Sequence, residues 1–110
     1  MTEKEFKEWE SEAFGYGYGT GETPILIILK TFLDSLKDKR LYDHQDLEKI
    51  FGAGITWLLI NALVKSDIIE YGTSPRFGWL TEKGEGLRDF MEGKSIEQLY
   101  EIIMSEDTNA

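Results

Sequence analysis

The sequence predicts a mainly helical α+β domain, and three observations lead to this class. Apolar residues recur at helical spacing in several segments of the 110-residue chain. One stretch, residues 68–80, has instead two short β-branched and aromatic runs joined by turn residues. The composition, 41% hydrophobic and 13% aromatic, is sufficient for one buried core. We therefore expect a single compact unit, with an arm at residues 1–22, a central domain at 23–92 and a C-terminal helix and frayed tail at 93–110.

The first element is a short amphipathic helix in which Phe6, Trp9 and Ala13 fall on one face. A glycine-aromatic stretch, FGYGYGTGE, follows it. A central, largely buried helix then starts with Thr23 and Pro24 and runs to about Lys37, because its apolar residues occupy nearly every side.

An extended piece at residues 40–42 leads to Asp43, which we expect to cap a helix carrying Leu47, Ile50 and Phe51 on its inner face. This helix is predicted to stop at Gly52-Ala53-Gly54, and a second helix is predicted from Ile55 to about Ser66. Two helices joined by such a short glycine turn form a tight, angled pair.

Residues 68–71 and 77–80 are predicted to pair as a hairpin around the turn sequence GTSPR. Thr81 is placed to cap a helix with Leu87, Phe90 and Met91 on one face. Ser95 and Gln98 have the spacing of a capping box at the start of a last helix. Its apolar stripe consists of Ile96, Leu99, Tyr100 and Ile103.

This order of elements resembles the winged helix-turn-helix superfamily over roughly residues 24–91. The segment LTEKGEGL, residues 80–87, is similar to the LTxxGxxL segment that leaves the wing in MarR-type and PadR-type regulators. The resemblance implies a two-stranded wing, with the N-terminal arm and the C-terminal helix added to it. In this segment Leu80 would close the core and Thr81 would cap the next helix. Gly84 would let that helix lie close to its neighbour.

The resemblance also implies a DNA-binding transcription regulator, in which residues 55–66 form the recognition helix and residues 73–76 the tip of the wing. On that basis the nucleic acid would be contacted by a small set of polar and basic residues: Thr56, Asn61, Lys65 and Arg76, aided by Lys39 and Arg40.

The predicted recognition helix, however, is apolar on two sides. Ile55, Leu58, Leu59, Ala62 and Leu63 cluster on the side that we assign to the core. The opposite side holds a second stripe, Trp57, Ile60 and Val64, where a DNA reader would carry polar side chains. We expect this stripe to be covered, either by a second protein chain or by the N-terminal arm.

A net charge of -9 disfavours electrostatic binding to nucleic acid or anionic lipid, because both carry negative charge. The rival function is therefore an acidic protein–protein interaction module that does not bind DNA, for example a phage-type inhibitor of a nucleic-acid-binding partner. Its interface would include Trp57, Ile60 and Val64. Leu99, Tyr100 and Ile103 would either pack on the domain or form a homodimer contact, since related regulators commonly dimerise through terminal helices.

Catalysis and cofactors are not expected. The chain has no cysteine, and its single histidine, His44, is predicted to lie on the surface. The glycine-aromatic stretch lacks the lysine and serine or threonine of a phosphate loop and places Glu22 at the helix entrance, so we expect a structural role for it. No secretory signal and no apolar run of about 18 residues is present, so we expect a cytoplasmic protein without a membrane partner.

Overall fold

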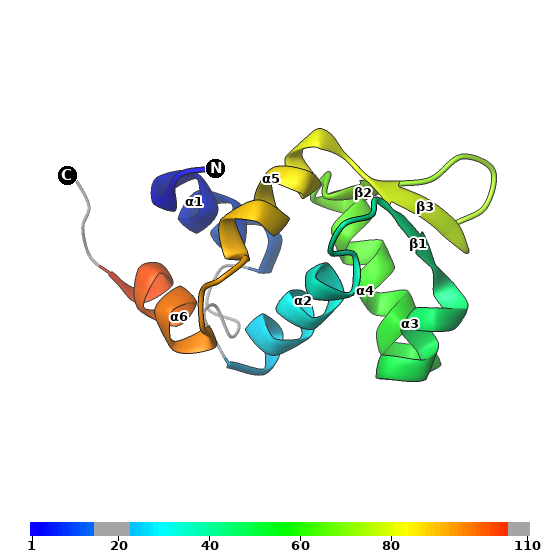
Figure 1. Ribbon diagram of the computed structural model, residues 1–110, viewed down its shortest axis with the longest axis horizontal. Helices are drawn as coiled ribbons and strands as arrows, with labels where there is room; N and C mark the ends of the chain where they lie inside the picture. The colour runs from blue at the N-terminus through cyan, green and yellow to red at the C-terminus, as the bar shows by residue number, and fades with distance from the viewer. Residues whose placement is uncertain (15–22, 106–110) are drawn as a thin grey trace.

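The computed structural model describes residues 1–14 and 23–105, and within them it is mainly helical with one small antiparallel sheet (Figure 1). The predicted α+β class is confirmed. The helices are α1 (Glu3–Phe14), α2 (Thr23–Ser35), α3 (His44–Phe51), α4 (Ala53–Lys65), α5 (Glu82–Met91) and α6 (Ile96–Met104). The strands are β1 (Leu41–Asp43), β2 (Ile69–Glu70) and β3 (Phe77–Leu80). Residues 15–22 of the glycine-aromatic stretch lie outside the described residues.

The sheet has the order β1-β3-β2, and both pairings are antiparallel. The predicted hairpin is therefore confirmed, and the extended piece before α3 joins it as a third strand. The register places Leu41 opposite Trp79 and Asp43 opposite Phe77. Because side chains alternate along a strand, Tyr42 and Leu80 point into the core while Leu41 and Phe77 point away from it.

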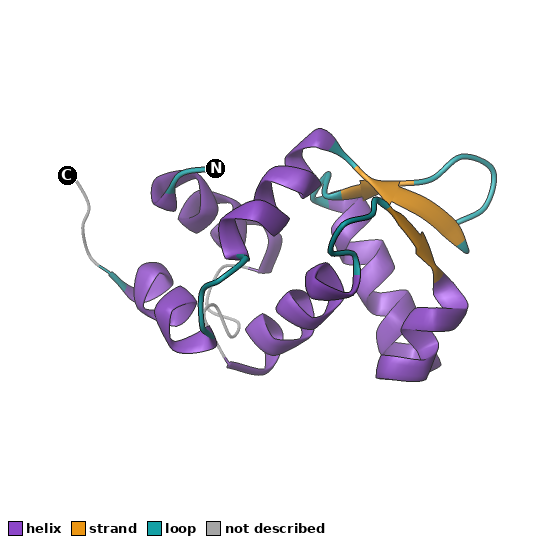
Figure 2. Cartoon of the chain, in the orientation of Figure 1, coloured by secondary structure: helices purple, strands orange, loops and turns teal. Residues whose placement is uncertain are grey.

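The helices form one core with the inner face of the sheet, and the sheet lies at one end of the molecule (Figure 2). Both terminal helices belong to this core. α1 contacts α4 and α6, and α6 also contacts α2. The Phe6 ring on α1 stacks on Phe90 of α5, with 5.0 Å between the ring centroids. The N-terminal helix and the C-terminal helix are thus packed parts of the same core.

The predicted caps are confirmed. The Asp43 carboxylate accepts the Gln45 amide, and the Thr81 hydroxyl accepts the Gly84 amide at 2.9 Å. Ser95 and Gln98 form a reciprocal capping box. Two details differ from the prediction. Only Gly52 separates α3 from α4, and Ala53 and Gly54 are already helical. Ile50, expected on the inner face of α3, is 50% exposed.

Candidate functional site: the outer face of α4

The entry into α4 is set by Gly52, whose φ of 81° lies in the left-handed region that favours glycine. Its amide donates to the Glu48 carbonyl at 2.8 Å, which ends α3, and its carbonyl accepts the Thr56 amide in the first turn of α4. The direction of α4 is therefore fixed at this one residue. That direction decides which side of the helix faces the core.

The buried side of α4 consists of Thr56, Leu59, Ile60 and Leu63. The prediction for this helix was wrong at two positions assigned to the core, because Ile55 is 43% exposed and Leu58 is 72% exposed. It was wrong again for Ile60, which was assigned to the outer side and is 2% exposed. The core face is rotated toward the predicted outer stripe, because the elements packed against α4 lie on that side.

Those elements belong to the same chain. Trp57 and Val64 are half-buried and pack against the core cluster. The Trp57 ring lies 5.6 Å from the His44 ring of α3, measured between centroids. On α1, the Trp9 indole nitrogen donates to the Ser66 carbonyl just beyond α4. Of the two expected covers, the N-terminal arm is the one that the structure supports, because its helix α1 lies against α4 together with α3. Ile60 is closed to a partner, whereas Trp57 and Val64 keep part of their surface exposed.

The outer face of α4 now consists of Ile55, Leu58, Asn61 and Lys65, which are exposed and follow helical spacing. The two apolar residues lie one turn apart at the N-terminal half, and the two polar ones follow in the C-terminal half. We call these four residues the α4 outer face. The pattern of apolar residues on all sides of this helix was visible in the sequence, but it did not identify which of them stay in contact with water.

The residues predicted to contact nucleic acid do not gather on one surface. Thr56 has no exposed surface, which excludes it from a contact with DNA. Asn61 and Lys65 are exposed on α4, and Arg76 is exposed in the β2–β3 turn. Lys39 is also exposed, but it precedes β1 and lies beside α5, since the Arg88 guanidinium donates to its carbonyl at 2.7 Å.

Arg40 is held by its own chain. Its Nε lies 2.9 Å from the Glu85 carboxylate of α5, and a terminal nitrogen donates to the Leu80 carbonyl at 3.1 Å. Arg40 lines a depression with Leu41 and Trp79, whereas Lys65 lines another one with Asn61 and Glu12. Arg40 and Lys65 therefore lie on two different surfaces.

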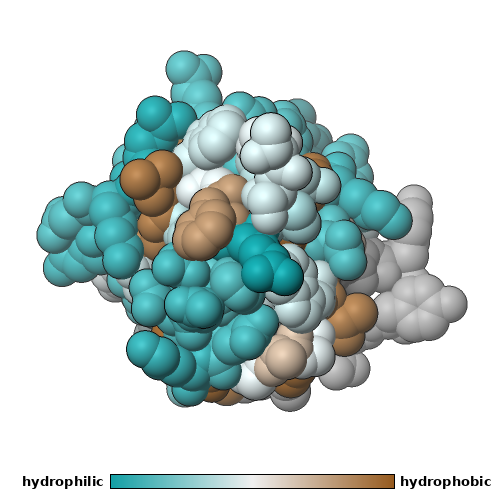
Figure 3. All heavy atoms as spheres, turned by 90° about the vertical axis from the view of Figure 1, so that its right-hand side faces the viewer, coloured by the Kyte–Doolittle hydropathy of each residue, from teal (hydrophilic) through white to brown (hydrophobic). Residues whose placement is uncertain are grey.

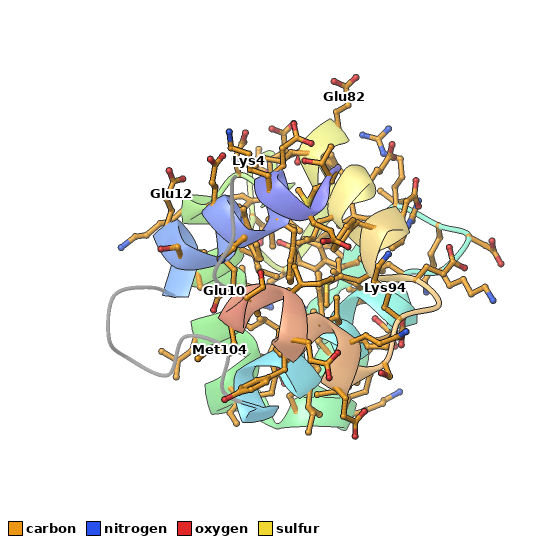
Figure 4. All side chains as sticks on the ribbon, turned by 90° about the vertical axis from the view of Figure 1, so that its left-hand side faces the viewer. Lys4, Glu10, Glu12, Glu82, Lys94 and Met104 are labelled. Carbon is orange, nitrogen blue, oxygen red and sulfur yellow. The ribbon has the colours of Figure 1, made fainter. Side chains whose placement is uncertain are left out.

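An acidic cleft borders the depression beside α4. It lies between α1 and α5 and is lined by Glu5, Glu8, Glu12 and Glu82, with Lys83 as its one basic residue among those lining it. Trp9, Glu12 and Lys83 line both hollows, so the cleft continues toward Asn61 and Ala62 of α4. Figure 4 shows Glu12 and Glu82 projecting outward from these two helices.

The apolar stripe predicted on the last helix turns inward. Leu99 has no exposed surface and Ile103 is also buried, so neither can form a dimer contact. Tyr100 of the same predicted interface is exposed. The contacts of α6 with α1 and α2 explain the difference, because the stripe is used to hold the two ends of the chain together.

His44 is another correction, because it is buried rather than on the surface. Its ring lies between Trp57 and Phe77, with the Phe77 centroid 6.0 Å away in an edge-on contact. Its Nδ1 lies 3.4 Å from the Asp43 carboxylate. Across residues 1–14 and 23–105, no three histidine, cysteine, aspartate or glutamate side chains come together as metal ligands.

None of the helices in the described residues has the length and apolar character needed to cross a membrane. Comparison with protein-family models, with curated proteins and with solved structures finds no match for this chain.

Proposed function

We propose that this chain is a non-catalytic, acidic protein–protein interaction module on a winged-helix-like frame, and that the α4 outer face binds its partner. The exposure of Leu58 carries this proposal. A helix that reads DNA needs polar or basic side chains on the face that enters the groove. In this position the chain presents Leu58 and Ile55, with Asn61 and Lys65 only in the following turns.

The magnitudes favour a protein partner. Burying an exposed leucine or isoleucine contributes about 1.5–3 kcal/mol per side chain. Leu58 and Ile55 therefore offer more to an apolar partner surface than Lys65 alone offers to a phosphate. A partner that covers them also replaces water at the centre of the contact, where binding energy concentrates.

The charge around the site indicates what kind of partner fits. The hollow beside Asn61 and Ala62 continues into the cleft that carries Glu5, Glu8 and Glu82. A partner that rests on both surfaces needs an apolar contact for Leu58 and basic side chains for the cleft. A nucleic-acid-binding surface has those basic side chains, and its occupation by this chain would keep nucleic acid away. We infer regulation by masking such a surface.

The test compares matched variants in partner capture from the source cells. Leu58→Glu should release a basic protein that the wild type retains, whereas Met104→Glu should keep it, because Met104 is a similarly exposed residue on α6. Both variants should keep the wild-type circular dichroism spectrum. Retention of the partner by Leu58→Glu, or a captured partner without a basic surface, contradicts the proposal.

DNA binding remains the second candidate, favoured by the exposure of Arg76 in the hairpin turn together with Asn61 and Lys65 on α4. In that case Lys65→Ala combined with Arg76→Ala should weaken binding to duplex DNA and flatten its salt dependence. If the interaction module is correct, the wild-type protein retards no duplex in low salt, and the DNA-binding candidate is excluded.

A further inference from the structure

The outer face of the sheet is a second exposed apolar surface, separate from the α4 outer face. Leu41 of β1 is 67% exposed and Phe77 of β3 is 57% exposed, and Trp79 of β3 is half-buried. The strand register places Leu41 directly beside Trp79. Figure 3 looks at the end of the molecule that carries the sheet and shows brown and tan hydrophobic surface bordered by teal hydrophilic residues. We call Leu41, Phe77 and Trp79 the sheet patch.

The sheet patch is held in a fixed geometry. The Trp79 indole nitrogen donates to the Glu70 carboxylate at 2.9 Å, which keeps the ring on the outer face of β3. The Phe77 ring packs edge-on against the buried His44. A rigid aromatic pair loses little conformational entropy when a partner covers it, and this favours binding.

The charges around the patch are arranged along the strands. Arg40 precedes β1 at one end, and Asp43 closes β1 at the other end. Arg76 precedes β3 at the Asp43 end, and its carbonyl accepts the His44 amide. Glu70 lies level with Trp79, toward the Arg40 end. Each end of the patch therefore carries charges of both signs.

We propose that the sheet patch binds a second copy of this chain in a two-fold symmetric dimer. A two-fold axis that lies between two facing sheets and crosses the strands reverses their direction. When the axis lies level with Leu41 and Trp79, it sets each of these two residues against its own copy, and it brings Asp43 of one copy toward Arg40 of the other. The patch is complementary to itself under this operation, as a symmetric interface requires.

The same arrangement explains why a second copy fits here better than elsewhere. Two chains of charge -9 repel each other wherever their acidic surfaces meet, as they would at the cleft between α1 and α5. At the sheet patch, Arg40 and Arg76 offset most of the charge of Asp43, Glu70 and the Glu85 carboxylate that pairs with Arg40. A standard interface buries roughly 800 Å² on each partner, and three apolar side chains supply only part of this area. We therefore expect a weak dimer that forms on the order of 100 µM.

The experiment is sedimentation equilibrium of the whole chain from about 10 µM to about 1 mM, a range that spans the expected dissociation constant. The wild type should change from monomer to dimer over this range. Leu41→Glu and Leu41→Lys should each remain monomeric, because each places like charges at the interface. An equimolar mixture of these two variants should form dimers again.

The control is Leu58→Glu, which alters an equally exposed leucine on α4 and should dimerise like the wild type. Circular dichroism verifies that every variant is folded. A wild type that stays monomeric at every concentration overturns the proposal, and so does a dimer that persists in Leu41→Glu or dissociates in Leu58→Glu. The Leu58 substitution tests partner binding and the Leu41 substitutions test the dimer. A failure of one proposal can therefore be distinguished from a failure of the other.

Discussion

At the scale of single residues, Gly84 lets α5 lie directly against the chain that precedes β2. A Cβ atom added there would lie 2.1 Å from the Ile68 carbonyl oxygen, which is backbone and cannot rotate away. We predict that Gly84→Ala lowers the free energy of unfolding by about 1–3 kcal/mol, because α5 must move away from the chain before β2. Urea denaturation measures this change.

The matched control for Gly84 is Gly86, two residues further along the same helix, where an added Cβ meets nothing within 4 Å. Gly86→Ala should raise the free energy of unfolding by about 0.5–1 kcal/mol, because alanine loses less conformational freedom in a helix than glycine does. Equal effects of the two substitutions would show that the contact with Ile68 does not limit the packing of α5.

Tyr42 is a residue whose ionisation links stability to pH. Burial, with a smaller contribution from nearby Tyr71, raises the pKa of the Tyr42 hydroxyl to about 12. The folded state therefore holds this proton in a pH range where the unfolded chain has already released it. We predict that stability falls as the pH rises from about 10 to about 12, since the unfolded state binds fewer protons there.

The pH dependence of Tyr42 can be isolated by comparison with Tyr42→Phe. The variant also loses the hydrogen bond that the hydroxyl donates to the Pro75 carbonyl at 2.9 Å, so its stability should be lower at neutral pH. The difference in free energy of unfolding between the two proteins should narrow from pH 10 to pH 12. A difference that stays constant across this range contradicts the raised pKa.

At the scale of elements, Gly52 and Gly54 have different roles at the junction between α3 and α4. Gly52 has a φ of 81° and a ψ of 162°, a conformation that only glycine adopts readily. We predict that Gly52→Ala costs about 1–3 kcal/mol of stability. Gly54 lies inside α4 with nothing within 4 Å of an added Cβ, so Gly54→Ala should be neutral or stabilising by up to about 1 kcal/mol. Thermal unfolding of both variants tests whether Gly52 alone makes the turn.

The sequence predicted the element types and their caps better than the orientation of α4. Asp43, Thr81 and the pair Ser95 and Gln98 form local hydrogen bonds that depend on spacing alone, so their signals are complete within a few residues. In α4, apolar residues occur on every side. Periodicity then cannot select the buried face, which is decided by contacts with α1 and α3 that are distant in the sequence.

The two exposed surfaces differ in how far they could have been predicted. The alternation along residues 77–80 implies that Phe77 and Trp79 share one face of the strand. The pairing of Leu41 with Trp79 depends on the third strand, and the sequence described that segment only as a brief extended piece. The sequence around His44 has no pattern that predicts the burial of this side chain, because the burial depends on Trp57 and Phe77 from two other elements.

At the scale of the whole molecule, the terminal helices decide which surfaces remain for binding. With α1 packed on α4 and α6 packed on α1 and α2, Ile60, Leu99 and Ile103 are removed from the set of accessible apolar residues. The apolar residues that remain exposed include those on the outer face of α4 and on the outer face of the sheet, and also Ile27 of α2, Ile50 of α3, and Tyr100 and Met104 of α6. The function proposed for each surface therefore requires that α1 stay packed on the core.

The importance of α1 is tested by Phe6, whose side chain has no exposed surface and stacks on Phe90 of α5. We predict that Phe6→Ala lowers the free energy of unfolding by about 3–5 kcal/mol, because it removes a buried ring and leaves a cavity between α1 and α5. Lys4→Ala, at the exposed position labelled in Figure 4, should change it by less than about 0.5 kcal/mol. If urea denaturation shows that Phe6→Ala costs less than about 1 kcal/mol, α1 is a separable arm. In that case the side of α4 that α1 contacts would become accessible to a partner whenever α1 detaches.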